Sequence, residues 1–284
     1  MLNQIKSSLV KKILPKRDPH SHKGENGRVL IVGGSLDYYG APILSALGTL
    51  YSGADLVYLF VPECNFDATR SMYPDFIVRK YKGDYLNVVA AKEIVEFGKN
   101  CDSVLIGPGL TEKEGVMEAV LEILKNLHIP TVLDADAICA LKKIDKFPLE
   151  QPVVITPHHN EFQNLVDKDI EVKEEDMKSI VFLRSLAMDL HVNVILKGTV
   201  DYVTSEEGSV ETNFTGNAGM TVGGSGDVLS GVVASFLAQG CDGFDSARAA
   251  AFVTGRAGDL LQKQKGFCFS ASDIAMTLPF AIQG

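Results

Sequence analysis

Short apolar runs and longer amphipathic stretches alternate along most of the chain. Runs rich in Val, Ile and Leu predict buried strands, and the stretches between them, with apolar residues at helical spacing, predict helices. The expected strands are 28–32, 55–61, 75–79, 103–106, 131–133, 153–155 and 193–196. The expected helices are 41–52, 86–97, 115–126, 176–190, 227–238 and 244–262.

The order of these elements predicts how the strands pair. Where a strand is followed by a helix and then by another strand, the connection is too long for a hairpin, so neighbouring strands should run parallel. Strands that are apolar throughout agree with this, because helices cover both faces of such a sheet. We therefore expect a three-layer α/β/α fold in which helices flank a mostly parallel central sheet.

Two later stretches are expected to depart from this rhythm. Residues 201–205 and 209–213 predict a hairpin around a Glu-Gly turn. The charged stretch 167–178 predicts a surface turn before a helix. Because no repeat, low-complexity stretch or linker divides the sequence, residues 1–284 are expected to form a single domain.

The first residues are expected to form a short amphipathic helix. Apolar positions alternate with lysines over residues 2–14, and Pro15 ends the pattern. The stretch lacks the continuous apolar core of a signal peptide, and the chain has no run of about 18 apolar residues. We therefore expect residues 1–19 to be a helix and arm that pack on the body or on another subunit, and the protein to be cytoplasmic.

Composition and charge narrow the class of partner. Apolar residues make up 46% of the chain and charged residues 22%, which is typical of a globular protein. The formal net charge of −9 argues against binding to nucleic acid or to anionic membranes, since both need basic surfaces. A nucleotide remains compatible, because main-chain N–H groups can hold phosphates. The scattered cysteines predict reduced thiols: Cys64, Cys101, Cys139, Cys241 and Cys268.

The most specific segment is the glycine-rich turn that precedes the predicted helix 227–238. It reads Asn-Ala-Gly-Met-Thr-Val-Gly-Gly-Ser-Gly-Asp over residues 217–227. Successive N–H groups in such a turn can point into one concavity, where the helix dipole adds positive charge. We therefore predict an anion hole for a phosphate, formed by Gly223, Gly224, Ser225 and Gly226.

Asp227 closes this turn and is the strongest candidate for chemistry. An Asp at a helix N-terminus often acts only as a cap. Beside an anion hole, its carboxylate can also take the proton of a substrate hydroxyl as that hydroxyl meets a phosphoryl group. The turn is not a Walker A loop, because no Gly-x-x-x-x-Gly-Lys-Ser/Thr occurs in the sequence. We predict an enzyme that binds a phosphate group at this turn and uses Asp227 as the base.

Several predicted strands end in glycine-rich or polar motifs. In an open parallel sheet ligands bind beyond the carboxyl ends of the strands, so these motifs are expected to share one edge. They are Gly33-Gly34-Ser35, Gly107-Pro108-Gly109, Asp134-Ala135-Asp136, Thr156-Pro157-His158 and Lys197-Gly198. Asp134 and Asp136 could hold Mg²⁺ through water or cap the next helix, and we expect no direct metal ligation.

Taken in order, the motifs resemble a known family. Gly-Gly-Ser-Gly-Asp opening a late helix is similar to the ribokinase-like superfamily, and within it the chain most resembles the ADP- or ATP-dependent NAD(P)H-hydrate dehydratases. The resemblance runs from about residue 20 to residue 240, and Asn217-Ala218-Gly219-Met220 is its most specific part. The other matches are His22-Lys23-Gly24, Gly33-Gly34-Ser35, Gly40-Ala41-Pro42, Gly107-Pro108-Gly109-Leu110, Asp134-Ala135-Asp136-Ala137, Thr156-Pro157-His158 with Glu161, Lys197-Gly198 and Gly226-Asp227.

This resemblance implies a reaction. The S-epimer of hydrated NADH or NADPH would be phosphorylated on its C6 hydroxyl and would then lose phosphate, which restores the reduced nicotinamide ring. ADP or ATP would be the co-substrate, with Mg²⁺, and Asp227 would take the hydroxyl proton. Two alternatives stay open at this point. A ribokinase-like kinase of a vitamin precursor, such as hydroxyethylthiazole or hydroxymethylpyrimidine, would share the turn, and a non-catalytic nucleotide-binding protein would keep it without turnover.

The resemblance also implies roles for individual residues. Those matching substrate contacts are Ala41, Gly109, His158 and Asp227. Those matching nucleotide contacts are Lys197, Gly198, Thr199, Val200, Asp201 and Gly226. His22 and Lys23 could bind substrate phosphates or belong to a disordered basic arm. Glu161, after Asn160, would help to organise metal-bound water, and Asn217 begins the most specific motif.

The sequence also departs from the family pattern. After Thr-Pro-His the family usually has Pro-Gly, whereas this chain has His159-Asn160. Where a threonine is common after Lys-Gly, this chain has Asp201, so ribose contacts could differ. The chain is expected to have no room for the N-terminal epimerase domain of many members, so a separate epimerase would cooperate with it. By resemblance we also expect ADP rather than ATP, and a homotetramer.

Overall fold

The computed structural model describes residues 2–14, 16–144, 147–166 and 177–283. Its strands are β1 (Asn3–Gln4), β2 (Arg28–Val32), β3 (Leu56–Pro62), β4 (Phe76–Tyr81), β5 (Ser103–Ile106), β6 (Thr131–Leu133), β7 (Val153–Ile155), β8 (Asn193–Leu196), β9 (Asp201–Thr204) and β10 (Val210–Asn213). Its helices are α1 (Ser7–Ile13), α2 (Gly40–Tyr51), α3 (Glu63–Met72), α4 (Val88–Gly98), α5 (Glu114–Asn126), α6 (His159–Val166), α7 (Met177–Leu190), α8 (Ser225–Ala238), α9 (Gly243–Lys265) and α10 (Ala271–Gln283). Two 3₁₀ helices are η1 (Ala135–Lys143) and η2 (Ala218–Thr221).

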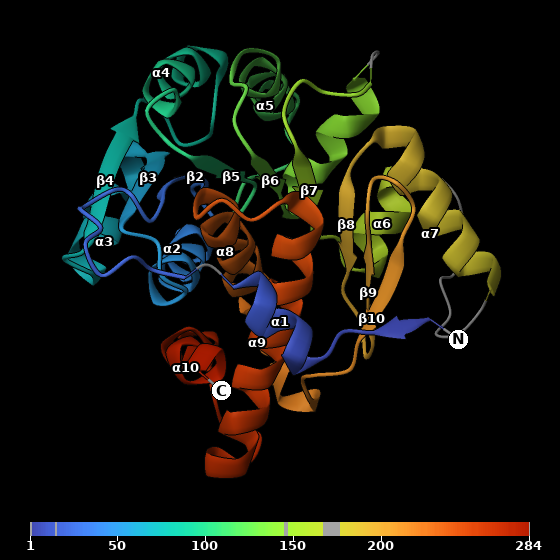
Figure 1. The fold of residues 1–284 in the computed structure, drawn as a ribbon. Coiled ribbons are helices and arrows are strands. Elements are labelled where there is room, and N and C mark those ends of the chain that lie inside the picture. The colour runs from blue at the N-terminus through green and yellow to red at the C-terminus, as the bar shows by residue number, and fades with distance from the viewer. Residues whose placement is uncertain (1, 15, 145–146, 167–176, 284) are drawn as a thin grey trace.

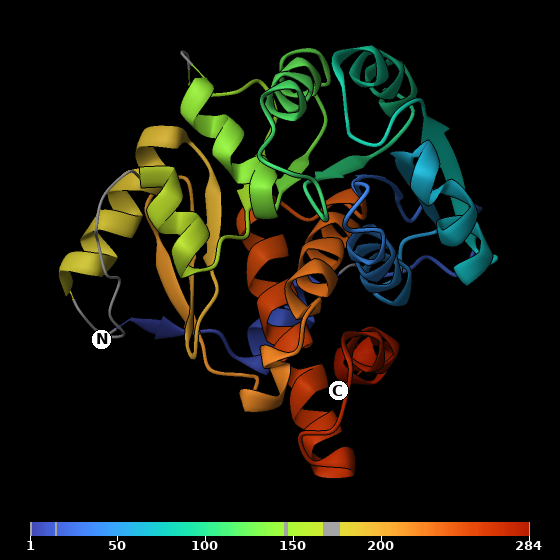
Figure 2. The same cartoon turned by 180° about the vertical axis from the view of Figure 1, so that it is seen from behind.

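The strands of the described residues form one sheet in the order β1-β10-β9-β8-β7-β6-β5-β2-β3-β4 (Figure 1). Every neighbouring pair from β8 to β4 is parallel, and only β9 runs against its two neighbours. Helices cover both faces, as the view from behind also shows (Figure 2). The predicted three-layer, mostly parallel α/β fold is confirmed.

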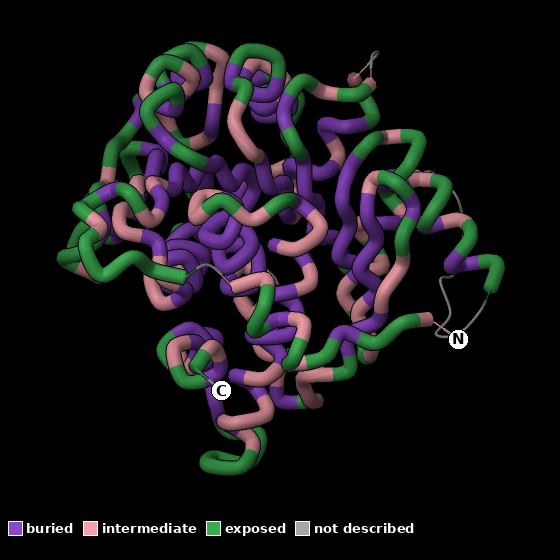
Figure 3. The backbone as a smooth tube through the Cα atoms, viewed as in Figure 1, coloured by how far each residue is buried: buried purple, intermediate pink, exposed green. Residues whose placement is uncertain are grey.

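Alternate residues of each central strand face opposite helical layers. On β2, Val29 and Ile31 belong to the apolar cluster under α2, α8, α9 and α10, whereas Leu30 belongs to the cluster under α4, α5 and α7. This follows from the two-residue period of a strand, because successive side chains point to opposite faces. Figure 3 shows the result as buried residues concentrated along the sheet and the helix packed centrally against it.

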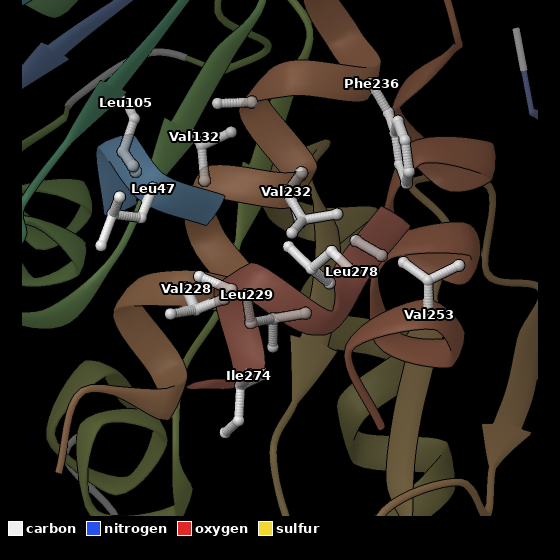
Figure 4. Packing of buried hydrophobic residues seen from close by; sticks show 14 of the residues in the cluster. Leu47, Leu105, Val132, Val228, Leu229, Val232, Phe236, Val253, Ile274 and Leu278 are labelled. Atoms are coloured by element: carbon white, nitrogen blue, oxygen red, sulfur yellow. The ribbon is translucent and has the colours of Figure 1, made fainter. Parts of the chain in front are cut away.

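That central helix is α8, whose first turn carries the glycine-rich motif. Val228 and Val232 of α8 pack beside Leu47 of α2 and Val253 of α9, so its side chains are enclosed by neighbouring helices (Figure 4). Because the helix is buried along most of its length, its position is fixed by close packing rather than by surface contacts.

Glycines let α2 and α8 approach each other at backbone distance. A Cβ on Gly231 would collide with the carbonyl of Ser45, and a Cβ on Gly48 would collide with the carbonyl of Val228. The Thr49 hydroxyl adds a cross-helix hydrogen bond to the Gly231 carbonyl at 3.0 Å. This contact therefore sets the height and rotation of α8, and with it the placement of its first turn.

The N-terminus differs from the expected helix over residues 2–14. Asn3 and Gln4 instead form β1, which pairs in parallel with β10, and the Ile5 N–H donates to the Thr212 carbonyl at 2.9 Å. The helix is limited to α1. The prediction was wrong here because the outer strand of the hairpin offers free main-chain partners, which an amphipathic pattern cannot reveal. Pro15, predicted to end the helix, lies outside the described residues.

Other boundaries agree with or extend the sequence prediction. The hairpin is confirmed as β9 and β10. No helix was predicted at α3, α6 or α10, and the structure adds all three. Residues 167–176 of the charged stretch lie outside the described residues. Among those that are described, no helix is long and apolar enough to cross a membrane.

Candidate functional site

The motifs at the carboxyl ends of the strands meet along one edge of the sheet. The Gly34 N–H donates to the Pro108 carbonyl at 2.8 Å, which joins the turns after β2 and β5. The Lys197 N–H donates to the Pro157 carbonyl at 2.9 Å, which joins the turns after β7 and β8. Between them, the Thr156 hydroxyl donates to the Asp134 carboxylate at 2.7 Å. The structure therefore brings together the row of motifs that the sequence placed at one edge.

The first turn of α8 has main-chain donors available for an anion. Gly224 precedes the helix with φ of +94°, a left-handed conformation that glycine adopts without strain. Within the described part of the chain, the N–H groups of Gly223, Gly224, Gly226 and Asp227 have no hydrogen-bond acceptor. The Ser225 N–H donates to the Val222 carbonyl at 3.4 Å, so it is less available to a ligand than its neighbours.

Asp227 is the third residue of α8 and does not cap it. The N-terminal cap is Gly224, which has no side chain, and the carboxylate of Asp227 makes no hydrogen bond to any described residue. Burial raises the pKa of Asp227 to about 7, and the negative charge of Asp134 acts in the same direction, while the Lys197 ammonium opposes it. A carboxylate with this pKa can accept a proton near neutral pH.

Lys197 lies at the centre of the charged groups. Its ammonium is 3.2 Å from Oδ1 of Asp134 and 3.8 Å from Oε2 of Glu161. It also lies 3.1 Å from the point where a side chain on Gly226 would begin. Glycine at position 226 therefore leaves room for this ammonium beside the first turn of α8.

A cavity of about 390 Å³ opens next to this lysine. Nine of the lining residues are among those proposed for the nucleotide, the anion hole or the family motif. They are Lys197, Gly198, Thr199, Asp201, Asn217, Ala218, Met220, Ser225 and Gly226. The rest is formed mainly by the segment after β10 and by α9. The volume falls within the range of small-molecule sites.

Asp201 fixes the loop that forms one wall of the cavity. Its carboxylate accepts hydrogen bonds from the Gly198 N–H at 3.1 Å and from the Asn213 amide at 3.0 Å. Burial raises the pKa of Asp201 to about 6. On the opposite wall Asn217 donates to Asp259 at 3.1 Å and accepts from the Gly219 N–H at 3.0 Å. Each wall is therefore held in place by one side-chain to main-chain and one side-chain to side-chain hydrogen bond.

Ala41 and Gly109 lie together on the other side of the row. A Cβ on Gly109 would stand 3.2 Å from the Ala41 methyl group and 2.8 Å from the Tyr38 carbonyl. Gly109 has φ of +71°, so glycine is favoured here by both conformation and space. The turn after β5 therefore packs directly against the first turn of α2.

The Glu161 side chain contacts both the main chain and the ring of His158 at the start of α6, and we call this pair the His158-Glu161 clasp. Glu161 accepts from the His158 N–H at 2.7 Å, and its other oxygen lies 3.3 Å from Nε2 of the same histidine. The Asn160 N–H donates back to Nδ1 of His158 at 3.1 Å. His159, which replaces the expected Pro-Gly turn, begins α6 and contacts the Lys197 carbonyl at 3.1 Å. The clasp therefore places Glu161 within reach of the Lys197 ammonium.

This arrangement of a helix start with free main-chain N–H groups, an unpaired carboxylate and a lysine can be compared with known proteins. The family model described as NAD(P)H-hydrate dehydratase matches residues 29–280. The chain belongs to the NAD(P)H-hydrate dehydratase family. Membership confirms the resemblance inferred from the motifs.

Individual members of the NAD(P)H-hydrate dehydratase family match most of the chain. The ADP-dependent (S)-NAD(P)H-hydrate dehydratase of Nitrosopumilus maritimus is 38% identical over 274 residues, which cover 95% of this chain and 93% of that protein. The bifunctional NAD(P)H-hydrate repair enzyme Nnr of Methanothermobacter thermautotrophicus is 38% identical over 269 residues, which cover 94% of this chain and 51% of that protein. The chain thus spans about half the length of such bifunctional relatives.

A solved structure of the family agrees with the fold. The ADP/ATP-dependent NAD(P)H-hydrate dehydratase of Bacillus subtilis, co-crystallised with ATP and Mg²⁺, superposes with a TM-score of 0.86 at 27% identity. The match covers 99% of this chain and 98% of that one. The observed fold is therefore that of a ribokinase-like family member.

His22 and Lys23 are not brought to this site. They precede β2, at the amino end of the strands, where both residues are exposed. The neighbouring Gly24 N–H donates to Asp55, which itself precedes β3, at 2.9 Å. In this chain the pair therefore lies at the edge of the sheet opposite the NAD(P)H-hydrate dehydratase motifs.

Sequence reasoning missed two partners within the site. Thr156 was noted only as part of a motif, and Asp134 only as a metal candidate or helix cap. The structure shows that the Asp134 side chain does not cap η1 and instead binds Thr156 and Lys197. Each directly follows a strand, Asp134 after β6 and Thr156 after β7, a signal that becomes informative only once the strand order is known.

Proposed function

We propose that this protein dehydrates the S-epimer of hydrated NADH or NADPH, using an adenine nucleotide as the phosphoryl donor. The observation that carries the proposal is the unpaired Asp227 carboxylate beside free N–H groups in the first turn of α8. A base next to an anion hole suits the transfer of phosphate to a hydroxyl. Family membership and the names of the relatives support the choice of substrate.

The chemistry follows from the positions of these groups. Asp227 takes the proton of the C6 hydroxyl as its oxygen bonds to the terminal phosphorus of the nucleotide, and the bond from that phosphorus to the bridging oxygen breaks. The N–H groups of Gly223, Gly224 and Gly226 stabilise charge on the moving group. Phosphate then leaves C6 with its bonding electrons, pushed by the ring nitrogen, and a proton lost from the neighbouring carbon restores the double bond.

We propose that substrate and nucleotide lie on opposite sides of Asp227. Ala41, Gly109 and His158 would contact the hydrated dinucleotide, since they match the substrate contacts of the family and none of them lines the cavity beside Lys197. The cavity bounded by the loop from Lys197 to Asp201, which includes Gly198, Thr199 and Val200, would hold the nucleotide. ADP is proposed as the donor because the matching stand-alone relatives are named ADP-dependent.

Magnesium fits this site only as a companion of the nucleotide. Within the described residues, no cluster of His, Cys, Asp or Glu could hold a metal ion by itself, and Asp134 is already engaged by Lys197. Mg²⁺ usually keeps several waters and binds through substrate phosphates with one or two carboxylates. Asp136 and Glu161 would face that water shell, and the ion would supply positive charge to the phosphates.

Several wider properties belong to the same proposal. We propose that residues 1–284 act as a single domain, that the protein works in the cytoplasm, and that four copies assemble into a homotetramer. A separate epimerase would supply the S-epimer, because the proposed reaction uses only one epimer. The bifunctional names of the longer relatives support such a link.

The direct test is a repair assay with ADP and ATP in separate reactions. Hydrated NADH, hydrated NADPH or neither is supplied, and return of the reduced-nicotinamide absorbance is recorded with the release of phosphate. Nucleotide-dependent return of absorbance supports the proposal. A stable phosphorylated product from a vitamin precursor would instead identify a kinase, and nucleotide binding without any turnover would identify a binding protein.

The rate of this reaction is expected to depend on pH through Asp227. The base must be ionised, and the pKa of Asp227 is raised to about 7. The value of kcat/KM for the hydrated substrate should therefore rise between about pH 6 and pH 8, with a midpoint near 7, because kcat/KM reports the pKa of the unliganded enzyme. The check is a pH profile of kcat/KM, with stability monitored at each pH. A flat profile over this range would contradict the assignment of the base.

A further inference from the structure

We propose that Asp134 is a positioning residue, which acts by holding the Lys197 ammonium beside Gly226. This inference rests on the proposed function, because the transferable phosphate is placed at the first turn of α8. Asp134 follows β6, Lys197 follows β8, and Gly226 is the second residue of α8. Three separate parts of the chain therefore have to meet for the ammonium to reach the anion hole.

The need for a positioning residue comes from the nature of lysine. Its ammonium sits on a flexible four-carbon stem, and a single location has to be selected by contacts at its tip. In this structure the nearer carboxylate is that of Asp134, at 3.2 Å, and the one from Glu161 is more distant, at 3.8 Å. Glu161 is also committed to His158. Asp134 is thus the main contact that sets the position of the ammonium.

Asp134 is itself rigidly held. Only 2% of the residue is exposed, and its N–H donates to the Ile106 carbonyl of β5 at 3.1 Å. The backbone of Gly107 packs so closely on Asp134 that a side chain at 107 would collide with its carbonyl. The Thr156 hydroxyl, from the end of β7, orients the carboxylate at 2.7 Å. The carboxylate is therefore fixed by the strands on both sides.

The charge balance favours a role beyond structure. A buried carboxylate without a partner is costly, and Lys197 removes that cost. A purely structural pair would be satisfied anywhere along the edge of the sheet. Here the ammonium is directed to the only residue of the first helical turn of α8 that lacks a side chain, Gly226, where it stands 3.1 Å from the position of a Cβ. That placement points the positive charge at the proposed phosphate.

The test is a double-mutant cycle between Asp134→Asn and Lys197→Met. If Asp134 acts through Lys197, Asp134→Asn should lower kcat about 10- to 100-fold in the native background and less than about 2-fold in the Lys197→Met background. In the native background, Asp134→Asn should change KM for the hydrated substrate little, because the proposed substrate contacts lie elsewhere. Losses that multiply in the double variant would overturn the proposal.

A second measurement keeps the test independent of turnover. In the unliganded protein, Asp134→Asn should raise the rate of acylation of Lys197 by a small amine-reactive reagent at least about 3-fold. The rate is read by mass spectrometry of the peptide that contains Lys197. An unchanged rate would show that Asp134 does not hold the ammonium. Failure of the repair assay in the native protein would instead reject the proposed function and leave this readout intact.

A milder variant covers the case in which Asp134→Asn does not fold. Thr156→Val removes the hydroxyl that orients the carboxylate, and Thr156→Ser keeps it. The valine variant should lose more kcat than the serine variant, by at least about 3-fold, and should label faster at Lys197. Equal behaviour of the two variants would contradict the role assigned to the Thr156-Asp134 bond.

Discussion

Replacing Asp227 with asparagine is expected to reduce kcat by about 10²- to 10⁴-fold, the usual contribution of a general base. Asparagine keeps the shape of the side chain but cannot take the hydroxyl proton. Nucleotide affinity should stay the same or increase, because a negative charge beside the phosphates is removed. The measurements are the repair assay and calorimetric titration of ADP. Survival of native-like turnover would show that another group is the base.

Thermal unfolding provides the folding control for this variant and has an expected sign. Because the pKa of Asp227 is about 7 in the folded protein and 3.8 is its ordinary value, the ionised carboxylate opposes folding. The contribution of Asp227 to the free energy of unfolding is fully present below about pH 4, where the carboxyl is neutral in both states. It is lost as the pH rises through about 7. At pH 8 the asparagine variant should be more stable by about 2 kcal/mol, roughly half of the full linkage value because the side chain is partly exposed. The gain should shrink at pH 5.

Replacing Gly231 with alanine is expected to give the largest loss of stability among single methyl additions in α8. The added methyl would collide with the Ser45 carbonyl of α2, and a backbone atom cannot rotate away as a side chain can. We expect the free energy of unfolding to fall by about 3 kcal/mol, measured by denaturant titration. Because the same contact sets the first turn of α8, kcat should fall as well.

Gly115→Ala is the matched control for this prediction. Gly115 is also helical, in α5, but no atom lies within 4 Å of a Cβ added there. Alanine should therefore stabilise the protein by about 0.5–1 kcal/mol, because glycine loses more conformational freedom on folding. If both variants behaved alike, the close approach of α2 and α8 would not be what fixes α8.

Most of the sheet could be predicted from the sequence. The strands β5, β6, β7 and β8 begin and end at the predicted residues, because each is a short apolar run bounded by turn-forming residues. Two of the missed helices carry local signals against a helix. The α3 helix buries Asn65 and Thr69 rather than large apolar residues, and α10 contains Pro279 in its interior. Tertiary packing rather than local pattern determines such helices.

The site could be predicted as a set of motifs but not as a set of contacts. Their placement at one edge follows from parallel strands alone. The meeting of Asp134 with Lys197 requires the order β6-β7-β8, in which their strands are separated by one neighbour, and periodicity does not encode that order. For His22 and Lys23 the sequence indicated only the neighbourhood of β2. A strand has two ends, and the structure places the pair at the end away from the motifs.

The pairing of β1 with β10 has a consequence for synthesis of the chain. Asn3 leaves the ribosome about two hundred residues before its partner Glu211, so β1 emerges early but is among the last strands that the sheet can accept. While β2 to β8 are already able to assemble, this outer position stays vacant and the emerging hairpin remains open to pairing with a neighbouring nascent chain. Insertion of the first residues therefore acts as a late step that closes the sheet edge.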